Sequence, residues 1–506
     1  MQSTFDLIVI GGGITGAGLF KEATSRGMRV LLLEKEDYAW GTSGRSSKMV
    51  HGGLRYLQHG HLKLTRDSVQ ERERLLQEAP GLIERIGFLM AVYQEKSVNR
   101  LLYGAGLGIY DLMAGNWQHT YHHAEDFQLL APHLRREGLM GGYQYFDAQT
   151  DDARLVLRLI QEGSQAGGTA FNRAPVTGLI TRQGQVSGVT YHHAGKEHTA
   201  HGLVVNATGV QCDHFREALQ EKPRLRPLRG SHLVIPHHRL PTLQALAFQH
   251  PADGRNVFVH PWHGHVLIGT TDVDHAAPLH LEPHISPEEQ QYLLEGARYA
   301  FPGVNLQAAD ITATWAGVRP VVSSGQKDPS KEAREHLITI EKGLTTVTGG
   351  KLTTFRLTAQ EALCTMGETF KTDFGTPTTR IFDPCAPMAN ALVSASTLKR
   401  LQGYYGAKTE QVLSGNLTPL HGTQYLQAEV QHAATEQVQH LSDLMLRRLR
   451  LGFYLPEGGK PLLPGVRDLA QPVLGWSDSR WEQEENAYLE LWASHYQKHH
   501  ETPALH

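Results

Sequence analysis

Cysteine is scarce in this chain, which has three in 506 residues, at positions 212, 364 and 385. Cysteines so far apart favour neither a disulfide framework nor a cysteine-ligated metal or iron–sulfur site, and their scarcity favours a reducing compartment. The 30 histidines follow no recognised ligand spacing, so no metal site is predicted. An excess of positive charge is lacking too. Because 48 basic residues stand against 51 acidic ones, nucleic acid is not expected as a partner.

Long apolar runs are also missing. No uninterrupted run approaches the roughly twenty residues that a membrane-spanning helix needs, so none is predicted. The chain enters a predicted strand after four residues and shows no basic segment followed by an apolar one, which argues against a signal peptide. Length, by contrast, is plentiful. Since 506 residues exceed what one hydrophobic core usually organises, two or three domains are expected.

The beginning of the chain carries a glycine fingerprint. Residues 5–10 form a short, mostly apolar run with β-branched side chains, which predicts a buried parallel strand. Gly11, Gly13 and Gly16 follow in the pattern G-x-G-x-x-G. The first glycine permits a tight turn, the second lets the backbone approach a pyrophosphate, and the third allows close packing of helix on strand.

The next residues complete a nucleotide-binding unit. A helix is predicted over about residues 14–25, followed by a second strand over residues 29–33 that ends at Glu34. A carboxylate at that strand end can accept both hydroxyls of a ribose, while the helix N-terminus holds the diphosphate. A lone fingerprint is weak evidence. Strand, glycines, helix, strand and acid in this order favour a nucleotide site over an ordinary tight turn.

Two segments after Glu34 are rich in groups suited to a bound nucleotide. Residues 41–48 are polar and small, with hydroxyls and backbone donors that fit the neighbourhood of a phosphate. In residues 51–57, two glycines lie between His51 and Arg55, which suggests backbone passing close to a bound ring. An ordinary loop is the alternative for this segment.

Together these motifs resemble the FAD-dependent glycerol-3-phosphate dehydrogenases, a family within the D-amino acid oxidase-like flavoproteins. The similarity continues in order over most of residues 5–366, through the runs 151–156, 206–209, 229–232, 269–272, 317–320 and 349–354. It implies oxidation of sn-glycerol 3-phosphate to dihydroxyacetone phosphate with non-covalently bound FAD and a quinone as electron acceptor. The implied fold class is α/β and α+β, with a Rossmann-type FAD-binding domain interleaved with an antiparallel-sheet substrate domain.

The fingerprint and the resemblance together assign cofactor contacts to strand ends and loops. Residues 347–350 lead into a predicted helix whose N-terminus, with Lys351, would point at the pyrimidine edge of the flavin, where reduction places negative charge. The residues predicted to bind FAD are Gly11, Gly13, Gly16, Glu34, Thr42, Ser43, Ser47, Val176, Ala207, Gly209, Gly350, Lys351, Leu352 and Thr353.

A phosphate monoester calls for arginines, because their planar fork matches two phosphate oxygens. Arg334 is the less secure match to the family, since Glu335 follows it where the family has aspartate. A surface ion pair is the alternative interpretation for each arginine. The residues predicted to bind the substrate are Arg55, Tyr56, Thr270, Arg319 and Arg334, with Lys351 as a further contributor.

Oxidation of an alcohol also requires a group that takes the hydroxyl proton. His51 and His232 are the candidates, because a neutral imidazole suits that task near pH 7. A structural role is the alternative for each, and His51 is also a candidate for a covalent link to the flavin. With Arg55, Arg319 and Lys351, the two histidines make up the predicted catalytic set.

Composition divides the chain into an oxidoreductase region, a linker and a helical domain. Residues 81–145 are interpreted as irregular because they are rich in glycine, tyrosine and histidine, whereas residues 226–310 alternate short strands and turns. The predicted divisions are an oxidoreductase region over 1–370 (FAD-binding parts about 1–80, 146–225 and 311–370; substrate parts about 81–145 and 226–310), a linker over 371–389, and a C-terminal α-helical domain over 390–506.

Three functions remain open at this point. The first is the quinone-linked glycerol-3-phosphate dehydrogenase. The second keeps the fold and the flavin but reacts with oxygen, or acts on another hydroxy acid or an amino acid. The third is a non-catalytic flavin-binding interaction protein. Arg55, Arg319 and Lys351 speak against the third, because binding FAD alone does not need arginines that bind phosphate.

The electron acceptor must come from outside, because the chain has no paired cysteines and no second dinucleotide fingerprint. The resemblance implies a quinone at the inner face of the cytoplasmic membrane, so a cytoplasmic protein with peripheral membrane contact is expected, and a homodimer is left open. Residues 444–455, with apolar side chains and three arginines, are one candidate contact. A packed helix whose arginines offset its dipole is the favoured alternative for that segment.

Overall fold

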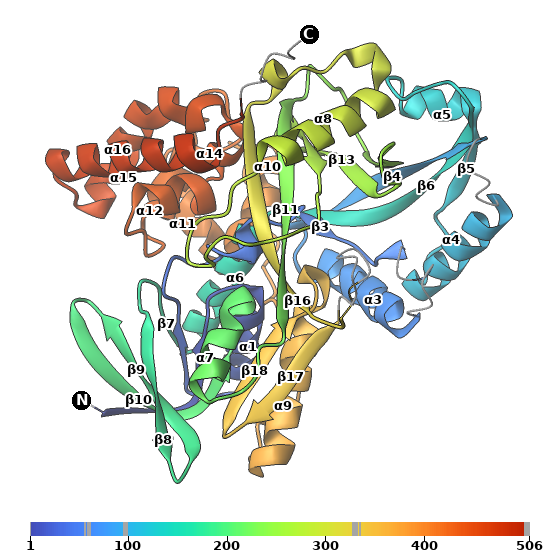
Figure 1. Ribbon diagram of the computed structural model, residues 1–506. Coiled ribbons are helices and arrows are strands. Elements are labelled where there is room, and N and C mark those ends of the chain that lie inside the picture. Colours follow the sequence, from blue (N-terminus) through green and yellow to red (C-terminus); the bar gives the residue numbers. More distant parts are fainter. Residues whose placement is uncertain are drawn as a thin grey trace.

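The computed structural model describes residues 2–54, 57, 62–94, 100–325, 332 and 335–499. Within these residues, one eight-stranded sheet, one ten-stranded sheet and a set of C-terminal helices make up the fold. Figure 1 shows the C-terminal helices α10 to α16 packed beside both sheets. The arrangement confirms the predicted combination of a Rossmann-type part, an antiparallel part and a helical C-terminal part.

The first sheet has a parallel centre built on the predicted nucleotide-binding unit. Its strand order is β17-β18-β10-β1-β2-β7, and the apolar side chains of β1 and β2 are buried on both faces. Helix α1 connects β1 to β2 and begins directly after Gly13, as predicted. The elements of this centre are β1 (Gln2–Ile10), α1 (Ile14–Ser25), β2 (Val30–Leu33), β10 (Lys196–Asn206) and β18 (Leu344–Gly349).

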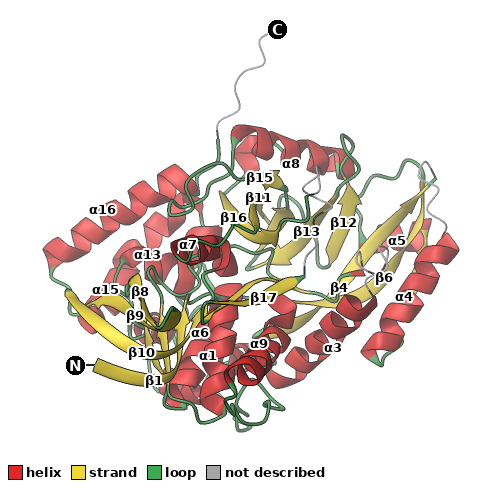
Figure 2. Cartoon of the chain, turned by 60° about the horizontal axis from the view of Figure 1, so that its bottom comes forward, coloured by secondary structure: helices red, strands yellow, loops and turns green. Residues whose placement is uncertain are grey.

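Two further helices pack with α1 on this sheet, and a hairpin extends it. Helix α6 (Asp152–Gln165) begins at a cap in which the Asp151 side chain accepts the Arg154 N–H at 3.0 Å. Figure 2 shows α9 (Phe355–Phe370) close to α1. Residues 176–193 form this antiparallel hairpin. The outer strands are β7 (Thr169–Phe171), β8 (Val176–Arg182), β9 (Gln185–His193) and β17 (His336–Glu341).

The second sheet is antiparallel at its centre and forms the opposite wall of the interior. Long strand β11 (Leu225–Pro236) pairs along its length with β16 (Ala313–Val322) and, towards its end, with β14 (His265–Gly269). The remaining strands are β3 (Met49–Val50), β4 (Ile83–Tyr93), β5 (Thr120–His123), β6 (Leu139–Thr150), β12 (Ala245–Gln249), β13 (Asn256–Trp262) and β15 (Val273–Asp274).

The prediction that residues 81–145 are irregular is wrong. Strands β4 and β6 pair over almost their whole length in this region, and helices α4 (Arg100–Ala114) and α5 (Ala124–Leu130) lie between them. The alternation of apolar and polar residues that marks a strand is hidden here, because glycine has no side chain and the tyrosine side chain is both apolar and polar. Helix α3 (Leu62–Glu78), which precedes this region, packs on α4.

Two elements differ from the predicted division of the chain into FAD-binding and substrate parts. Strand β16 falls in residues 311–370, which were assigned to the FAD-binding part, but its pairing with β11 places it in the second sheet. Helix α8 (Pro287–Ala300) interrupts residues 226–310, which were expected to be strands and turns. Its start is a capping box of Ser286 and Glu289, with Pro287 in the first turn. That signal is visible in the sequence.

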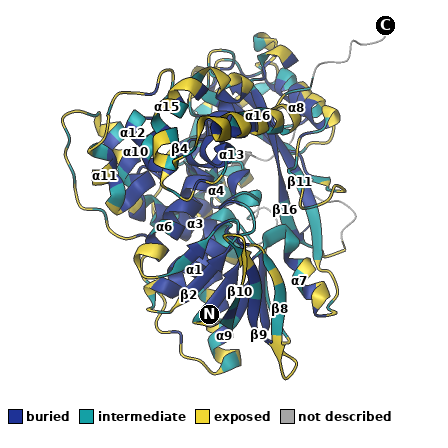
Figure 3. Ribbon diagram, turned by 90° about the vertical axis from the view of Figure 1, so that its left-hand side faces the viewer, coloured by how far each residue is buried: buried dark blue, intermediate teal, exposed yellow. Residues whose placement is uncertain are grey.

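The C-terminal helices share a hydrophobic core with the first sheet. Residues 371–394 contain no helix or strand, yet Ile381 and Phe382 are buried, and the Ile381 N–H donates to Glu78 at 2.8 Å. Figure 3 shows the buried interior of this region. Its α-helices are α10 (Ala395–Tyr405), α11 (Thr409–Leu413), α12 (Gln427–Ala434), α13 (Leu441–Asp443), α14 (Leu451–Tyr454), α15 (Leu463–Leu474) and α16 (Asp478–His495).

Residues 444–455 cannot form the membrane contact that the sequence suggested as one candidate. Leu444, Leu451 and Phe453 are buried, and so are the three arginines of the segment. The arginines also do more than offset a helix dipole, because they pair with carboxylates of the first 152 residues. Among the described helices, none is long and apolar enough to cross a bilayer.

Candidate active site

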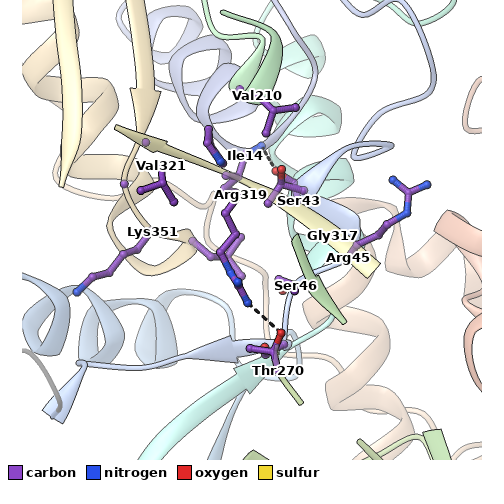
Figure 4. A pocket seen from close by; sticks show the side chains of 18 of the residues that line it. Ile14, Ser43, Arg45, Ser46, Val210, Thr270, Gly317, Arg319, Val321 and Lys351 are labelled. Atoms are coloured by element: carbon purple, nitrogen blue, oxygen red, sulfur yellow. Dashed lines mark hydrogen bonds between the residues drawn. The ribbon is translucent and has the colours of Figure 1, made fainter. Parts of the chain in front are cut away.

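A cavity of about 1070 Å³ lies between the two sheets and extends from the ends of the parallel strands to the second sheet. Figure 4 shows side chains from several elements meeting in it. Apart from Gly16, every described residue predicted for the cofactor, the substrate or catalysis lines this cavity. Those lining residues are Gly11, Gly13, Glu34, Thr42, Ser43, Ser47, His51, Val176, Ala207, Gly209, His232, Thr270, Arg319, Gly350, Lys351, Leu352 and Thr353.

Three of the residues predicted to bind substrate cannot be placed. Arg55, Tyr56 and Arg334 lie outside the described residues. Their assignment therefore stays a prediction.

The three fingerprint glycines have different reasons for being glycine. Gly11 has φ of +110°, and a Cβ there would lie 2.5 Å from the Ala207 carbonyl oxygen. A Cβ on Gly16 would lie 1.8 Å from the Gly11 carbonyl oxygen, so α1 can pack on the turn only if this side chain is absent. Gly13 faces Ser43, whose Oγ would be 3.1 Å from an added Cβ. These distances agree with the predicted turn and with the predicted helix–strand packing.

The N-terminus of α1 opens on the cavity beside the loop of residues 41–48. Gly13 caps the helix without a side chain, and the Ile14 N–H donates to Ser43 Oγ at 2.8 Å. Figure 4 shows this contact as a dashed line. The Thr42 hydroxyl donates to the Val318 carbonyl oxygen and ties the loop to the second sheet. A helix N-terminus with small neighbours is suited to a diphosphate.

Glu34 stands at the end of β2 with its carboxylate held by the backbone. The Gly12 N–H donates to one oxygen at 2.7 Å and the Glu36 N–H to the other at 2.8 Å. Burial raises the pKa of Glu34, and the two N–H donors oppose that shift. Each carboxylate oxygen has a second lone pair, so the side chain can still accept from ribose hydroxyls.

The glycines at the end of β18 lead into a short 3₁₀ turn rather than directly into an α-helix. Gly349 and Gly350 both have positive φ, and residues Leu352–Thr354 form the turn that precedes α9. The α-helix therefore begins a few residues later than predicted. Lys351 Nζ donates to Ser68 Oγ at 3.1 Å, and Thr353 Oγ1 donates to the His51 carbonyl oxygen at 3.2 Å. These contacts connect the turn to α3 and to residue 51.

Arg319 projects from β16 into the cavity and is oriented by the loop after β14. Its Nη1 donates to Asp272 Oδ1 at 2.9 Å. Its Nη2 donates to Thr270 Oγ1 at 3.0 Å, a contact drawn as a dashed line in Figure 4. Gly230 lies directly beneath, and a Cβ there would be 2.2 Å from Nη2. Asp272 was not predicted as a site residue, although it belongs to the run 269–272 that carried the resemblance.

His232 lies on β11 and contacts the loop of residues 41–48. Its Nε2 and Ser47 Oγ are 2.8 Å apart, and its ring stacks on Trp315 with centroids 4.9 Å apart. Burial lowers the pKa of His232 well below the usual range, and the charges of Lys48 and Arg319 lower it further. The imidazole is therefore neutral near pH 7, which is the form that accepts a proton.

The residues present fit a flavin dinucleotide. The cavity exceeds the volumes usual for drug-sized ligands, so it can hold a dinucleotide together with a small substrate. At one end of the cavity lie the Glu34 carboxylate, which follows β2, and the N-terminus of α1, which is capped by Gly13. FAD bound along these strand ends would present its ring towards Lys351 and Arg319 at the other end.

Comparison with known proteins agrees with this site. Residues 6–359 match the FAD dependent oxidoreductase family (DAO), and residues 372–481 match the C-terminal domain of alpha-glycerophosphate oxidase. An aerobic glycerol-3-phosphate dehydrogenase of Bacillus subtilis is 34% identical over 430 residues, which cover 82% of this chain and 76% of that protein. One of Staphylococcus aureus (strain MRSA252) is 34% identical over 391 residues, covering 75% and 69%.

Solved structures show the same fold. The glycerol-3-phosphate dehydrogenase from Bacillus halodurans, complexed with FAD, superposes with a TM-score of 0.73 at 26% identity over 96% of this chain and 95% of that one. The L-alpha-glycerophosphate oxidase from Mycoplasma pneumoniae, with FAD bound, has a TM-score of 0.59 at 17% identity over 72% of this chain and 94% of that one. The second likeness shows the fold alone.

Fold and site together define an FAD-dependent oxidoreductase of the D-amino acid oxidase type, with FAD as its cofactor. Within that class, the chain belongs to the family of the aerobic glycerol-3-phosphate dehydrogenases.

Proposed function

We propose that this protein oxidises sn-glycerol 3-phosphate to dihydroxyacetone phosphate with non-covalently bound FAD and passes the electrons to a quinone. The observation that carries the proposal is the pairing of Arg319 with Thr270 and Asp272. This group lies in the same cavity as His232 and the residues suited to bind the nucleotide. The substrate named in the relatives' descriptions supports the same choice.

The arginine, its two partners and His232 have distinct tasks in this reaction. Arg319 binds two phosphate oxygens through its guanidinium fork, and Asp272 and Thr270 fix the direction in which the fork points. His232 takes the proton of the reacting hydroxyl at Nε2, where Ser47 Oγ already lies within hydrogen-bond distance. His51, Lys351, Arg55, Tyr56 and Arg334 complete the proposed set. When bound, FAD supplies the acceptor for the hydride that leaves the substrate carbon.

Steady-state turnover with an artificial dye tests the substrate. Purified yellow protein is expected to reduce the dye with sn-glycerol 3-phosphate and to be far slower with glycerol, because glycerol has no phosphate for Arg319 to bind. Dye reduction is followed by absorbance at increasing concentrations of each alcohol. Equal kcat/KM values for the two alcohols would remove phosphate recognition from the proposal.

A membrane surface would bring the quinone within reach, and α4 offers a suitable face. Leu102 and Leu112 of α4, and Trp117 shortly after the helix, are each more than two-thirds exposed, although all three are large and apolar. The one acidic residue of the helix, Asp111, is buried and accepts N–H groups from residues 118 and 119. An exposed face of this kind fits the boundary of a lipid bilayer.

Two neighbours of this face support the choice. Figures 1 and 2 show α3 beside α4, and Lys63 and Arg66 of α3 are exposed, as a surface that meets anionic headgroups requires. Tyr103 of α4 lines the active-site cavity, so the same helix adjoins the site of oxidation. We assign the peripheral membrane contact of this proposal to α3 and α4.

Negative charge placed on that face should weaken membrane binding without affecting oxidation of the substrate. We expect Leu102→Asp with Leu112→Asp to release the protein from anionic vesicles and to slow reduction of a membrane quinone, while dye turnover stays near wild type. Leu243→Asp is the matched control, because Leu243 is 83% exposed but lies before β12. Vesicle pelleting at low salt and quinone reduction are measured. Undiminished pelleting of the double variant would contradict this assignment.

An oxidase is the second candidate for the same flavin site. The match of residues 372–481 to the C-terminal domain of alpha-glycerophosphate oxidase favours it. The two candidates differ in the acceptor. Stoichiometric hydrogen peroxide from sn-glycerol 3-phosphate, with no acceleration by quinone, would replace the quinone with oxygen.

A further inference from the structure

Arg450 is a fully buried arginine of the C-terminal region that reaches back to the loop beside the active site. Its Nη2 donates to the Gly44 carbonyl oxygen at 2.8 Å and to Asp152 Oδ1 at 3.0 Å. Its Nη1 donates to the Leu446 carbonyl oxygen at 2.9 Å, which anchors the side chain in its own segment. Arg450 therefore connects residues that lie far apart in the chain and match different families.

Asp152, which Arg450 contacts, also accepts hydrogen bonds from Ser46 and Lys48; these four residues and Gly44 are called the cluster below. Asp152 is fully buried at the start of α6, and it accepts the Ser46 N–H at 2.9 Å and the Ser46 hydroxyl at 2.7 Å. Lys48 Nζ donates to both oxygens of Asp152 at 2.9 Å and to the Gly44 carbonyl oxygen at 3.1 Å. Asp152 and Arg450 thus hold residues 44, 46 and 48 of one short loop.

The residue enclosed by these contacts is the one that meets His232. Ser47 lies between Ser46 and Lys48, and its Oγ is 2.8 Å from His232 Nε2 in the cavity wall. The loop has little room to relax elsewhere, since a Cβ on Gly44 would already lie 2.3 Å from the Ala39 carbonyl oxygen. A shift at residue 44 or 46 therefore moves Ser47 relative to His232.

The cluster needs a permanent positive charge. Three aromatic rings surround Lys48, those of Trp262, Trp315 and Phe453, with centroids 5.0 to 5.4 Å from Nζ. Burial and the nearby Arg450 lower the pKa of Lys48 to about 7, so it loses its charge as the pH rises above neutrality. Arginine keeps its charge at every pH of interest. A buried carboxylate without a cation is strongly destabilised.

We propose that Arg450 is a positioning residue for the reaction, through which the C-terminal region holds residues 44–48 and fixes Ser47 against His232. The inference rests on the proposed role of His232 as proton acceptor. Arg450 touches neither substrate nor cofactor in this role. The C-terminal helices thereby become a part of the active site rather than a separate structural domain.

Replacement of Arg450 tests the proposal against a matched arginine. Arg448 comes from the same segment, is equally buried, and pairs with Asp37 at 2.9 Å without contacting residues 44–48. We expect Arg450→Met, assayed with excess FAD, to lower kcat for sn-glycerol 3-phosphate by about 10- to 100-fold with KM little changed, since misplacement of about 1 Å costs that much. Arg448→Met should lower thermal stability similarly but leave kcat near wild type.

Two further variants exclude a merely structural effect. Arg450→Lys keeps the charge but cannot donate to Leu446, Gly44 and Asp152 together, so its kcat should lie between those of Arg450→Met and the wild type. If Arg450 acts through Ser47, Ser47→Ala and Arg450→Met should not be additive, and the double variant should be hardly slower than the worse single one. Additive losses, or equal losses of kcat in Arg448→Met and Arg450→Met, would overturn the proposal.

A chemical readout separates this proposal from the function proposed above. His232 is 2% exposed, and the rate at which diethyl pyrocarbonate acylates it can be followed by peptide mass spectrometry in the FAD-loaded protein. We expect faster acylation in Arg450→Met and an unchanged rate in Arg448→Met. If wild-type protein fails to oxidise sn-glycerol 3-phosphate but these rates hold, the substrate is wrong and the positioning stands. Unchanged acylation in Arg450→Met would refute the positioning.

Discussion

Purified Gly16→Ala protein is expected to contain little or no FAD. Alanine is favoured over glycine inside a helix by about 1 kcal/mol, so the change would stabilise α1 if there were space. There is none, because the new Cβ would lie 1.8 Å from the Gly11 carbonyl oxygen and 3.3 Å from Val9 Cγ1. The N-terminus of α1 must then move away from the end of β1, which removes the close packing on which diphosphate binding depends.

The ratio of flavin absorbance to protein absorbance measures this loss, and far-UV circular dichroism shows whether the fold persists. Gly106→Ala is the matched control, since it is also a change inside a helix but has no heavy atom within 4 Å of the new Cβ. We expect full FAD content in that variant. A yellow, fully loaded Gly16→Ala protein would show that this packing is not needed for the cofactor.

Arg319→Ala is expected to lower kcat/KM for sn-glycerol 3-phosphate by roughly ten- to 150-fold. That range corresponds to a charge-assisted hydrogen bond worth about 1.5–3 kcal/mol. Part of the loss should appear in kcat, because binding of the phosphate also places the reacting carbon. Removal of the guanidinium leaves the Asp272 carboxylate facing the phosphate, which works in the same direction.

The comparison with glycerol makes this prediction specific. The slow oxidation of glycerol should change little in Arg319→Ala, so the preference for the phosphorylated alcohol should collapse. Arg319→Lys keeps a charge but loses the fork and should recover only part of the activity. Arg226→Ala is the control, because Arg226 pairs with Asp274 on the neighbouring strand outside the cavity. An Arg319→Ala enzyme with unaltered kcat/KM would exclude Arg319 as a phosphate ligand.

Local sequence patterns predicted the parts of the fold that local physics controls. The run at residues 5–10, the three glycines and Glu34 are near neighbours in sequence, and their chemistry requires one arrangement of strand, turn and helix. The strands of residues 81–145 were not predicted, because neither β4 nor β6 has a clear pattern of its own and only their pairing with each other identifies them as strands.

The sequence alone determined the nucleotide-binding unit, because its strand, glycines, helix and acid are near neighbours with one physical use. The resemblance carried by the further motifs implied FAD and most of the residues that line the cavity. Tertiary structure decided which of those residues meet. Ser47 and His232 are 185 residues apart, and Arg450 and Asp152 are 298 apart. The same apolar and basic pattern at residues 444–455 suits a membrane surface or a buried ion pair. Only the position of Asp37 and Asp152, which are distant in sequence, makes it the second.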